Sequence, residues 1–299
     1  MWLALALVSA TLLGFYDVFK KLSLRDNPVI PVLCLNCMFS ALLMLPLEYH
    51  AEHFRFCLQE QGFYLLKAII VMLSWICGYA GLKNLPITIV GPINATRPVM
   101  VLIGALTFLG EHLNLLQWIG VLIAITSFYL LSRSGRKEGI DFRHNRWIVC
   151  VVLANVFGAL SALFDRYLLN PDGLHLNQEP VQFWFNAYQG LLLAIYLLIR
   201  YMHARNRRLP ANDNHPPQRI TFHWSILLIS VSLTLADYAY FRALSQPDAL
   251  ISIVSMIRRG SVVVSFLFGA IIFHEKNLKA KAIDLALVLL SMAFLCLGS

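Results

Sequence analysis

The sequence predicts an all-α integral membrane protein with ten transmembrane helices, arranged as two inverted five-helix repeats. Three observations lead to this prediction. The chain of 299 residues is 59% hydrophobic and only 13% charged, whereas soluble globular proteins are usually about 45–50% apolar and about 25% charged. Apolar segments of membrane-spanning length recur along the chain. The third to fifth of these segments also resemble the eighth to tenth.

Ten segments approach the roughly 20 apolar residues that a membrane-spanning helix needs. In order, they cover residues 2–24, 30–47, 63–84, 87–109, 114–132, 147–169, 181–200, 222–244, 248–273 and 280–298. Turn-forming or charged stretches separate them, such as Asn27-Pro28, Leu85-Pro86 and "SRSGRKEGIDFRHNR". Such stretches interrupt helices, so the sequence predicts spans joined mostly by short loops.

The loops on one side of the predicted bundle carry most of the basic residues. With the N-terminus outside, seventeen of the 24 Lys and Arg fall on the inner side, and Arg55, Lys67 and Arg242 fall on the outer side. Loops on the cytoplasmic side of a membrane are enriched in Lys and Arg. We therefore expect a multi-pass protein of a bacterial-type inner (plasma) membrane, with both termini periplasmic or exterior. Basic loops, rather than a nucleic-acid surface, account for the net charge of +8.

The repeat is visible when two stretches are placed side by side. "YAGLKNLPITIVGPINATRPVMVLIGALTFLGEHL" aligns with "YAYFRALSQPDALISIVSMIRRGSVVVSFLFGAIIFHEKNL". The alignment pairs Tyr79 with Tyr238, Lys83 with Arg242, Arg97 with Arg258 and Arg259, and Glu111 with Glu275; in the earlier spans, Asp17 pairs with Asp165 and Asn36 with Asn186. Because five spans is an odd number, the second copy, 139–299, enters the membrane upside down relative to the first, 1–138. Inverted repeats of this kind are a transporter architecture.

Several of these motifs resemble a known family. The spans ending "LTFLGEHLNLLQWIGVLIAITSFYLL" and "GAIIFHEKNLKAKAIDLALVLL", together with "YAGLKNLPITIVGP", resemble the EamA family of the drug/metabolite transporter superfamily. The resemblance covers nearly the whole chain, and the repeated Glu after a Gly-containing span end is its most specific element. It implies ten helices in two inverted halves, a central cavity and transport of a small metabolite. Members differ widely in substrate, so the resemblance implies the architecture more than the cargo. In the usual picture of the family both termini are cytoplasmic, whereas the charge count favours the exterior.

Three arginines are predicted to lie near the middle of the membrane. Arg97 belongs to the fourth span, and Arg258 and Arg259 belong to the ninth. An arginine at a helix centre costs roughly 2.5–3.5 kcal/mol, so such residues usually face the interior of a bundle. A guanidinium group binds carboxylate or phosphate through a bidentate fork. One interpretation is therefore an anion-binding site, with Asn94 on the same side of its helix as Arg97.

The alternative interpretation is that buried acids hold these arginines. Asp17, Asp165 and Asp237 lie within predicted spans, and each could neutralise a base. Acids in a low-dielectric medium can also exchange protons, so the same three residues are candidates for coupling transport to protons. A facilitator that needs no ion fits the sequence equally well.

Further polar residues are candidates for lining the path. Tyr79 with Lys83, and Tyr238 with Arg242, are i, i+4 pairs. In one interpretation their rings line the path and their bases lie at its ends. In the other, the tyrosines lie at the membrane interface and the bases extend towards the lipid headgroups. Asn36 and Asn186 could hydrogen-bond a substrate or link helices. Glu111 and Glu275 lie at span ends, where a helix cap or loop contact is expected. No catalytic motif, metal site or cofactor site is predicted.

Three classes of function remain open from the sequence. The first is a secondary transporter or exporter of a small, anionic metabolite, working by alternating access. The second is a flippase for a phosphate-bearing lipid such as a polyprenyl-phosphate carrier. The third is a membrane scaffold without transport. The expected partners are a small-molecule or lipid-linked anion and membrane lipids, with no nucleic acid, for a monomer or homodimer.

Overall fold

The computed structural model describes residues 1–24, 27–50, 58–84, 93, 96–133, 146–206, 224–261, 263–264 and 278–298. Every regular element in these ranges is a helix, which confirms the all-helical prediction for the described residues. The helices are α1 (Trp2–Leu24), α2 (Val29–His50), α3 (Leu58–Asn84), α5 (Arg97–Phe108), α6 (Leu115–Arg133), α7 (Arg146–Leu169), α8 (Gln178–Asn206), α9 (Trp224–Leu244), α10 (Ile251–Arg259) and α12 (Leu278–Leu297).

The outward surface of the helices is apolar. Six of them, α1, α2, α3, α7, α8 and α9, are long and apolar enough to cross a membrane. Large hydrophobic side chains point outwards, including Leu42, Leu122 and Ile199, each at least 60% exposed. Water does not tolerate apolar surface over such an extent, but the hydrocarbon of a bilayer does. The protein is therefore a multi-pass membrane protein.

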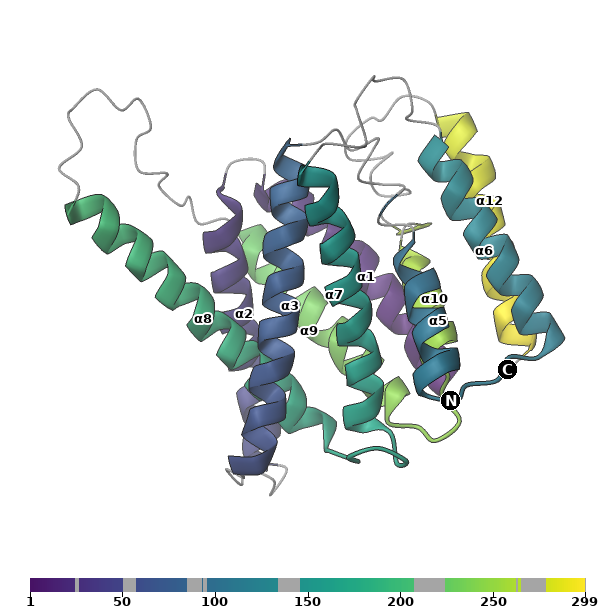
Figure 1. Ribbon diagram of the computed structural model, residues 1–299, viewed down its shortest axis with the longest axis horizontal. Helices are drawn as coiled ribbons and strands as arrows, with labels where there is room; N and C mark the ends of the chain where they lie inside the picture. Colours follow the sequence, from purple (N-terminus) through teal and green to yellow (C-terminus); the bar gives the residue numbers. More distant parts are fainter. Residues whose placement is uncertain are drawn as a thin grey trace.

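Helices from the two predicted halves pair with one another. The most extensive contacts are those of α1 with α9, α2 with α8, α3 with α7 and α6 with α12. In Figure 1, α6 and α12 stand together at the right of the molecule, and both chain ends lie at its lower right. By their order in the two halves, α1 corresponds to α7, α2 to α8, α3 to α9 and α6 to α12. Exchanging each helix for its counterpart turns the pair α1·α9 into α7·α3 and leaves the pairs α2·α8 and α6·α12 unchanged. This pattern is the one that a twofold relation between two five-helix halves would produce.

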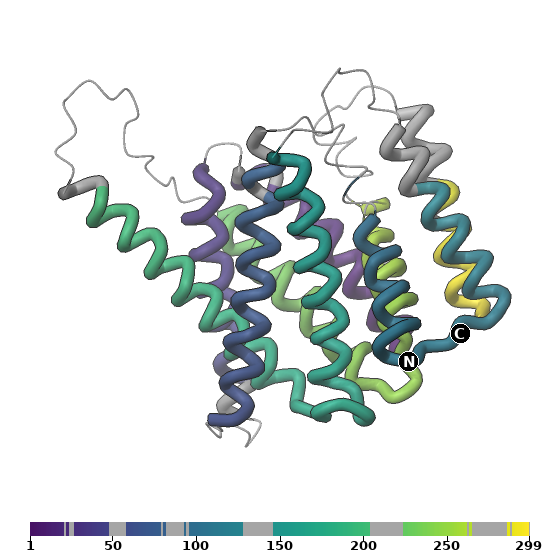
Figure 2. The backbone as a smooth tube through the Cα atoms, in the orientation of Figure 1, coloured from purple at the N-terminus to yellow at the C-terminus, as the bar shows by residue number. Residues whose placement is uncertain are grey.

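Small residues allow the paired helices to approach closely. A Cβ added to Gly78 of α3 would lie 3.5 Å from the Ala154 Cβ of α7. On α6, a Cβ added to Gly120 would lie only 2.8 Å from the Leu295 Cγ of α12. In membranes, helix association depends on this kind of close packing between small residues. Figure 2 shows α6 and α12 side by side at one end of the molecule, opposite the end that α8 occupies.

Two predicted spans are not continuous helices. The span predicted over 87–109 has a turn at Thr96, whose hydroxyl and N–H both donate to the Ile93 carbonyl, at 2.7 and 3.1 Å. α5 then begins at Arg97, with Pro98 at its start. Proline has no N–H, so it fits the first turn of a helix and not its interior. In the span predicted over 248–273, α10 ends at Arg259 and the Gly260 N–H donates to the Ile257 carbonyl at 2.8 Å. Arg97 therefore lies at the start of α5, and Arg258 and Arg259 lie just before a turn at Gly260, after which the chain is helical again at Ser261.

Candidate functional site

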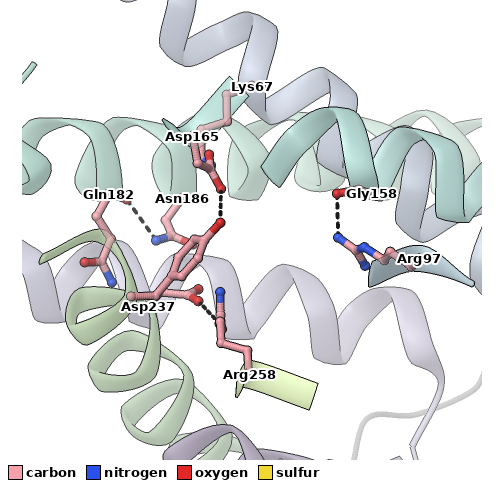
Figure 3. A network of polar contacts seen from close by, with 9 residues as sticks. Lys67, Arg97, Gly158, Asp165, Gln182, Asn186, Asp237 and Arg258 are labelled. Carbon is pink, nitrogen blue, oxygen red and sulfur yellow. Dashed lines mark hydrogen bonds and ion pairs between the residues drawn. The ribbon is translucent and has the colours of Figure 1, made fainter. Parts of the chain in front are cut away.

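Two ion pairs join four helices in the interior of the bundle. Lys67 of α3 pairs with Asp165 of α7, and Arg258 of α10 pairs with Asp237 of α9 at 2.7 Å. Figure 3 shows both pairs in the same region. The side chains of the first pair are only 2% and 7% exposed, whereas those of the second are each 18% exposed. The Arg258–Asp237 pair can therefore be reached from outside the protein, and the Lys67–Asp165 pair is sealed.

Tyr240 of α9 lies between the two ion pairs. Its hydroxyl donates to Asp165 Oδ2 at 3.3 Å. The guanidinium carbon of Arg258 lies 4.0 Å from the centre of its ring, which is a close cation–π contact. One side chain thus contacts an acid of the sealed pair with its hydroxyl and a base of the reachable pair with its ring.

The charge of Lys67 is balanced entirely within the protein. Besides Asp165, its ammonium nitrogen lies 4.6 Å from the ring centre of Phe185 and 4.8 Å from that of Phe241. The charge count along the sequence treated Lys67 as a charge of the outer side, whereas the structure shows it buried within the bundle and paired with Asp165. α3 begins at Leu58, earlier than the predicted start at residue 63, so Lys67 lies in its third turn, where it is buried.

Arg97 has a different environment from the other interior cations. Its Nη2 donates to the Gly158 carbonyl of α7 at 2.8 Å, as Figure 3 shows. A Cβ on Gly158 would lie 2.6 Å from both Nε and Nη2 of Arg97, so the guanidinium occupies the space that the missing side chain leaves. In the described part of the chain, no carboxylate forms an ion pair with Arg97.

Arg259 is the last residue of α10, and α1, which carries Asp17, packs against α10. The side chains of Arg259 and Asp17 are both partly buried.

The interior charges do not cancel. Among the described residues the region holds the four bases Lys67, Arg97, Arg258 and Arg259 against the three acids Asp17, Asp165 and Asp237. The interpretation that buried acids hold the arginines describes Arg258, which pairs with Asp237. Even there, the Arg258 Nε is buried without a hydrogen-bond partner in the described residues. Arg97 forms no ion pair with a carboxylate of the described residues.

The two predicted asparagines are both buried. Asn186 of α8 is 4% exposed and its Nδ2 donates to the Gln182 carbonyl at 2.8 Å. Asn36 of α2 is 1% exposed, and neither its Nδ2 nor its Oδ1 has a partner among the described residues.

The other predicted path residues are not brought to this region by the described structure. Arg242 is exposed near the end of α9, and Tyr238 is partly buried. Neither makes a contact with the ion pairs above. The side chains of Tyr79 and Lys83, and the whole of Asn94, lie outside the described residues.

Two further charged residues act as helix caps. Glu111, as expected for a span end, accepts hydrogen bonds from the Ile251 N–H at 2.6 Å, the Ser252 N–H at 3.2 Å and the Ser252 hydroxyl at 2.5 Å, at the start of α10. Arg166 donates to the carbonyls of Leu244, Gln246 and Pro247, at the end of α9. Backbone groups at helix ends have no partner within the helix, so these side chains satisfy them. Glu275 lies outside the described residues.

Sequence reasoning missed Lys67, Tyr240 and Gln182. A signal was available for Gln182, because Gln182, Asn186 and Gln189 recur at i, i+4 and i+7 in an otherwise apolar stretch of α8. Lys67 stands alone among apolar residues and close to a predicted span end. Its burial depends on Asp165, 98 residues further along the chain.

Comparisons with known proteins agree with this architecture. The model of the EamA-like transporter family matches residues 1–133, which confirms the resemblance noted in the sequence for that part of the chain. One solved structure, described only as the crystal structure of a protein, superimposes with a TM-score of 0.75 at 14% sequence identity, covering 99% of this chain and 96% of that one. At that identity the likeness shows a shared fold. The comparison with curated proteins gave no significant match.

Proposed function

We propose that this chain, whose residues 1–133 belong to the EamA-like transporter family, is a secondary transporter or exporter of a small anionic metabolite. Proteins of this family move small molecules across membranes. The observation that carries the anionic specificity is the environment of Arg97. Its guanidinium donates to a backbone carbonyl and is paired with no acid of the described residues, so its charge remains available to an anion.

Arg258 would be the second contact to the anion. One of its nitrogens holds Asp237, but its Nε is unpartnered among the described residues. A guanidinium donates along two parallel directions to a carboxylate or phosphate. An anion arriving at Arg258 would therefore share the guanidinium with Asp237 or displace it.

The helix arrangement supports an alternating-access mechanism. Two spans are interrupted at Thr96 and Gly260, beside the arginines. Interrupted helices near the midplane are a common feature of transporters built from repeats. We propose the repeats 1–138 and 139–299 as the moving halves, in a bacterial-type inner membrane with both termini exterior.

A thermal-stability screen of the purified protein tests the anion site. Amino acids, organic acids, sugar phosphates, nucleotides and polyprenyl phosphates are added in turn, since a ligand that binds the native state raises the melting temperature. We expect anions to stabilise the wild type and to lose this effect in Arg97→Ala and Arg258→Ala. Arg242→Ala is the matched control, because Arg242 is exposed. Equal stabilisation of all four proteins would show that the arginines are not the site, and a response confined to polyprenyl phosphates would favour a flippase.

A flux assay tests transport and ion coupling. The stabilising anion is loaded into proteoliposomes, and uptake is measured with and without a pH gradient. Proton coupling through Asp17, Asp165 or Asp237 requires a response to the gradient. An unchanged rate would identify a facilitator.

A further inference from the structure

Beside the ion pairs, three helices bury a set of uncharged polar side chains. α8 contributes Gln182, Asn186 and Gln189 at i, i+4 and i+7, so they lie along one face of the helix. Across from them are Asn36 and Ser40 of α2 and Thr234 of α9. All six residues are at most 5% exposed. We refer to these six residues as the amide seam.

Most of the amide seam is not hydrogen-bonded within the described protein. The unpartnered buried atoms are Asn36 Nδ2 and Oδ1, Ser40 Oγ, Gln182 Oε1, Gln189 Nε2 and Thr234 Oγ1. The bonds that do form among the described residues are few. Gln182 Nε2 donates to the Thr234 carbonyl at 2.8 Å, Asn186 Nδ2 donates to the Gln182 carbonyl at 2.8 Å, and Cys37 Sγ donates weakly to Gln189 Oε1 at 3.6 Å. A buried polar group without a partner destabilises a fold. Six such atoms in one region therefore lower the stability of the fold, and folding by itself does not explain why these polar side chains are there.

The position of the amide seam places it next to the charged site. On α2, Val32 packs with α1 and α9, while Cys34 and Cys37 pack with α8. At 100° per residue, Asn36 and Ser40 lie on the helix surface between these two contact faces, towards the interior. Thr234 lies one turn before Asp237 on α9. Figure 3 shows Gln182 and Asn186 in the same region as the Arg258–Asp237 ion pair.

The unpartnered atoms of the amide seam comprise both donors and acceptors without charge. An anionic group would not suit it, because the acceptor oxygens of Asn36 and Gln182 would face it. A hydroxyl group suits it, because a hydroxyl both donates and accepts. An amide group offers the same combination on two atoms. Carboxamide side chains therefore fit a ligand rich in hydroxyl or amide groups.

We propose that the amide seam binds the uncharged hydroxyl- or amide-bearing part of the transported anion, while Arg97 and Arg258 bind its charge. This inference rests on the proposed function and specifies the substrate class: a small anion with a polar, hydrogen-bonding body. A binding site built to hydrogen-bond a ligand discriminates strongly against the analogue that lacks those groups, because the site is then left unpaired.

Pairs of anions with matched charge and carbon number test this proposal. Glycerol 3-phosphate is compared with propyl phosphate, and gluconate with hexanoate, by calorimetric titration of the purified protein. We expect the wild type to bind the hydroxylated member at least about tenfold more tightly. In Asn36→Leu and Ser40→Ala the preference falls to within about threefold, because the affinity for the hydroxylated member drops and that for its partner is retained.

Two controls separate binding from folding. Ser9→Ala removes a buried hydroxyl that donates to the Ala236 carbonyl at 2.7 Å outside the amide seam, and we expect it to keep the preference. The melting temperature of Asn36→Leu is expected to equal or exceed that of the wild type, because an apolar group of similar shape replaces an unpartnered polar one. A lowered melting temperature with an unchanged preference would show that Asn36 serves the fold, and would overturn the proposal.

The remaining outcomes are also decisive. If the wild type does not prefer the hydroxylated member of either pair, including the case in which neither member binds, the amide seam is not a substrate site. If glycerol or glucose binds as tightly as the corresponding anion, and Asn36→Leu but not Arg97→Ala abolishes that binding, the amide seam is supported and the anionic specificity is overturned.

Discussion

At the scale of single residues, the contact between Arg97 and Gly158 positions a charge, and a change at residue 158 can move that charge without unfolding the protein. The group that a Cβ at residue 158 would meet is the guanidinium, the far end of a flexible side chain. The helix backbone around it would not need to move. The guanidinium, in contrast, would lose its place against the Gly158 carbonyl.

We therefore predict that Gly158→Ala weakens anion binding about tenfold or more while changing the melting temperature by only a few degrees. The matched control is Gly78→Ala in α3, where the new Cβ would meet Ala154 at an ordinary contact distance of 3.5 Å. Titration with the stabilising anion, together with thermal unfolding, measures both effects. Unchanged binding in Gly158→Ala would show that the position of Arg97 is unimportant for the ligand.

A second prediction concerns the sealed ion pair of Lys67 and Asp165. Removing one member of a buried pair leaves the other charge without compensation and typically destabilises by about 3–5 kcal/mol, whereas replacing both by apolar residues is often neutral. We expect Lys67→Met to be strongly destabilised, and the double variant Lys67→Met/Asp165→Leu to regain most of the loss. Chemical unfolding of the wild type, both single variants and the double variant measures the coupling. Additive losses would contradict the pairing.

At this scale the sequence predicted which residue types matter better than it predicted their partners. Asp165, Asp237, Arg97 and Arg258 were all candidates from their depth in apolar segments. Which acid holds which base depends on the packing of helices far apart in the chain, as with Lys67 and Asp165. Hydropathy along one segment carries no information about the side chains of another.

At the scale of elements, α10 depends on a cap that another segment provides. Glu111 lies in the connection between α5 and α6, yet its carboxylate accepts three hydrogen bonds at the start of α10. α10 ends at Arg259. The cap therefore fixes the beginning of the helix whose end holds Arg258 and Arg259.

We predict that Glu111→Gln destabilises the protein by about 2 kcal/mol, because hydrogen bonds to a charged acceptor contribute roughly 1.5–3 kcal/mol and the amide nitrogen would face donors. Glu179→Gln, in the first turn of α8, is the control; among the described residues Glu179 accepts one hydrogen bond, from Gln178 Nε2 at 3.0 Å. Thermal unfolding in detergent measures the difference. Equal losses in the two variants would argue against a special role for the Glu111 cap.

The elements also show where sequence reasoning fails for physical reasons. The helices that match predicted spans have ends within a few residues of the expected ones, because apolar length decides whether a segment enters a membrane. The interruptions at Thr96 and Gly260 were not predicted. The hydropathy of the sequence is the same on both sides of a break in the backbone hydrogen bonds, so it does not reveal the break. Pro98 and Gly260 are the residues in these spans that favour one.

At the scale of the whole molecule, the orientation in the membrane remains a prediction from the charge of the loops. We expect alkaline phosphatase fused after the last residue to be active, because the C-terminus is predicted to be exterior, and green fluorescent protein fused there to be dark. Fusions within the Pro- and Asn-rich stretch 203–221, which the sequence predicts to be a cytoplasmic linker, should give the reverse. The opposite pattern at both sites would place the termini in the cytoplasm, as in the usual picture of the family.

The pairing of helices between the two halves has a consequence for synthesis of the protein. α1, α2, α3 and α6 each find their most extensive partner among α7, α8, α9 and α12. A nascent chain that ends after α6 thus holds four membrane helices whose partners have not been made. Lys67 must wait for Asp165, 98 residues later, and at roughly 5–20 residues per second the delay is roughly 5–20 s. During that interval the ammonium group of Lys67 lies in a newly inserted helix without the carboxylate that neutralises it in the folded protein.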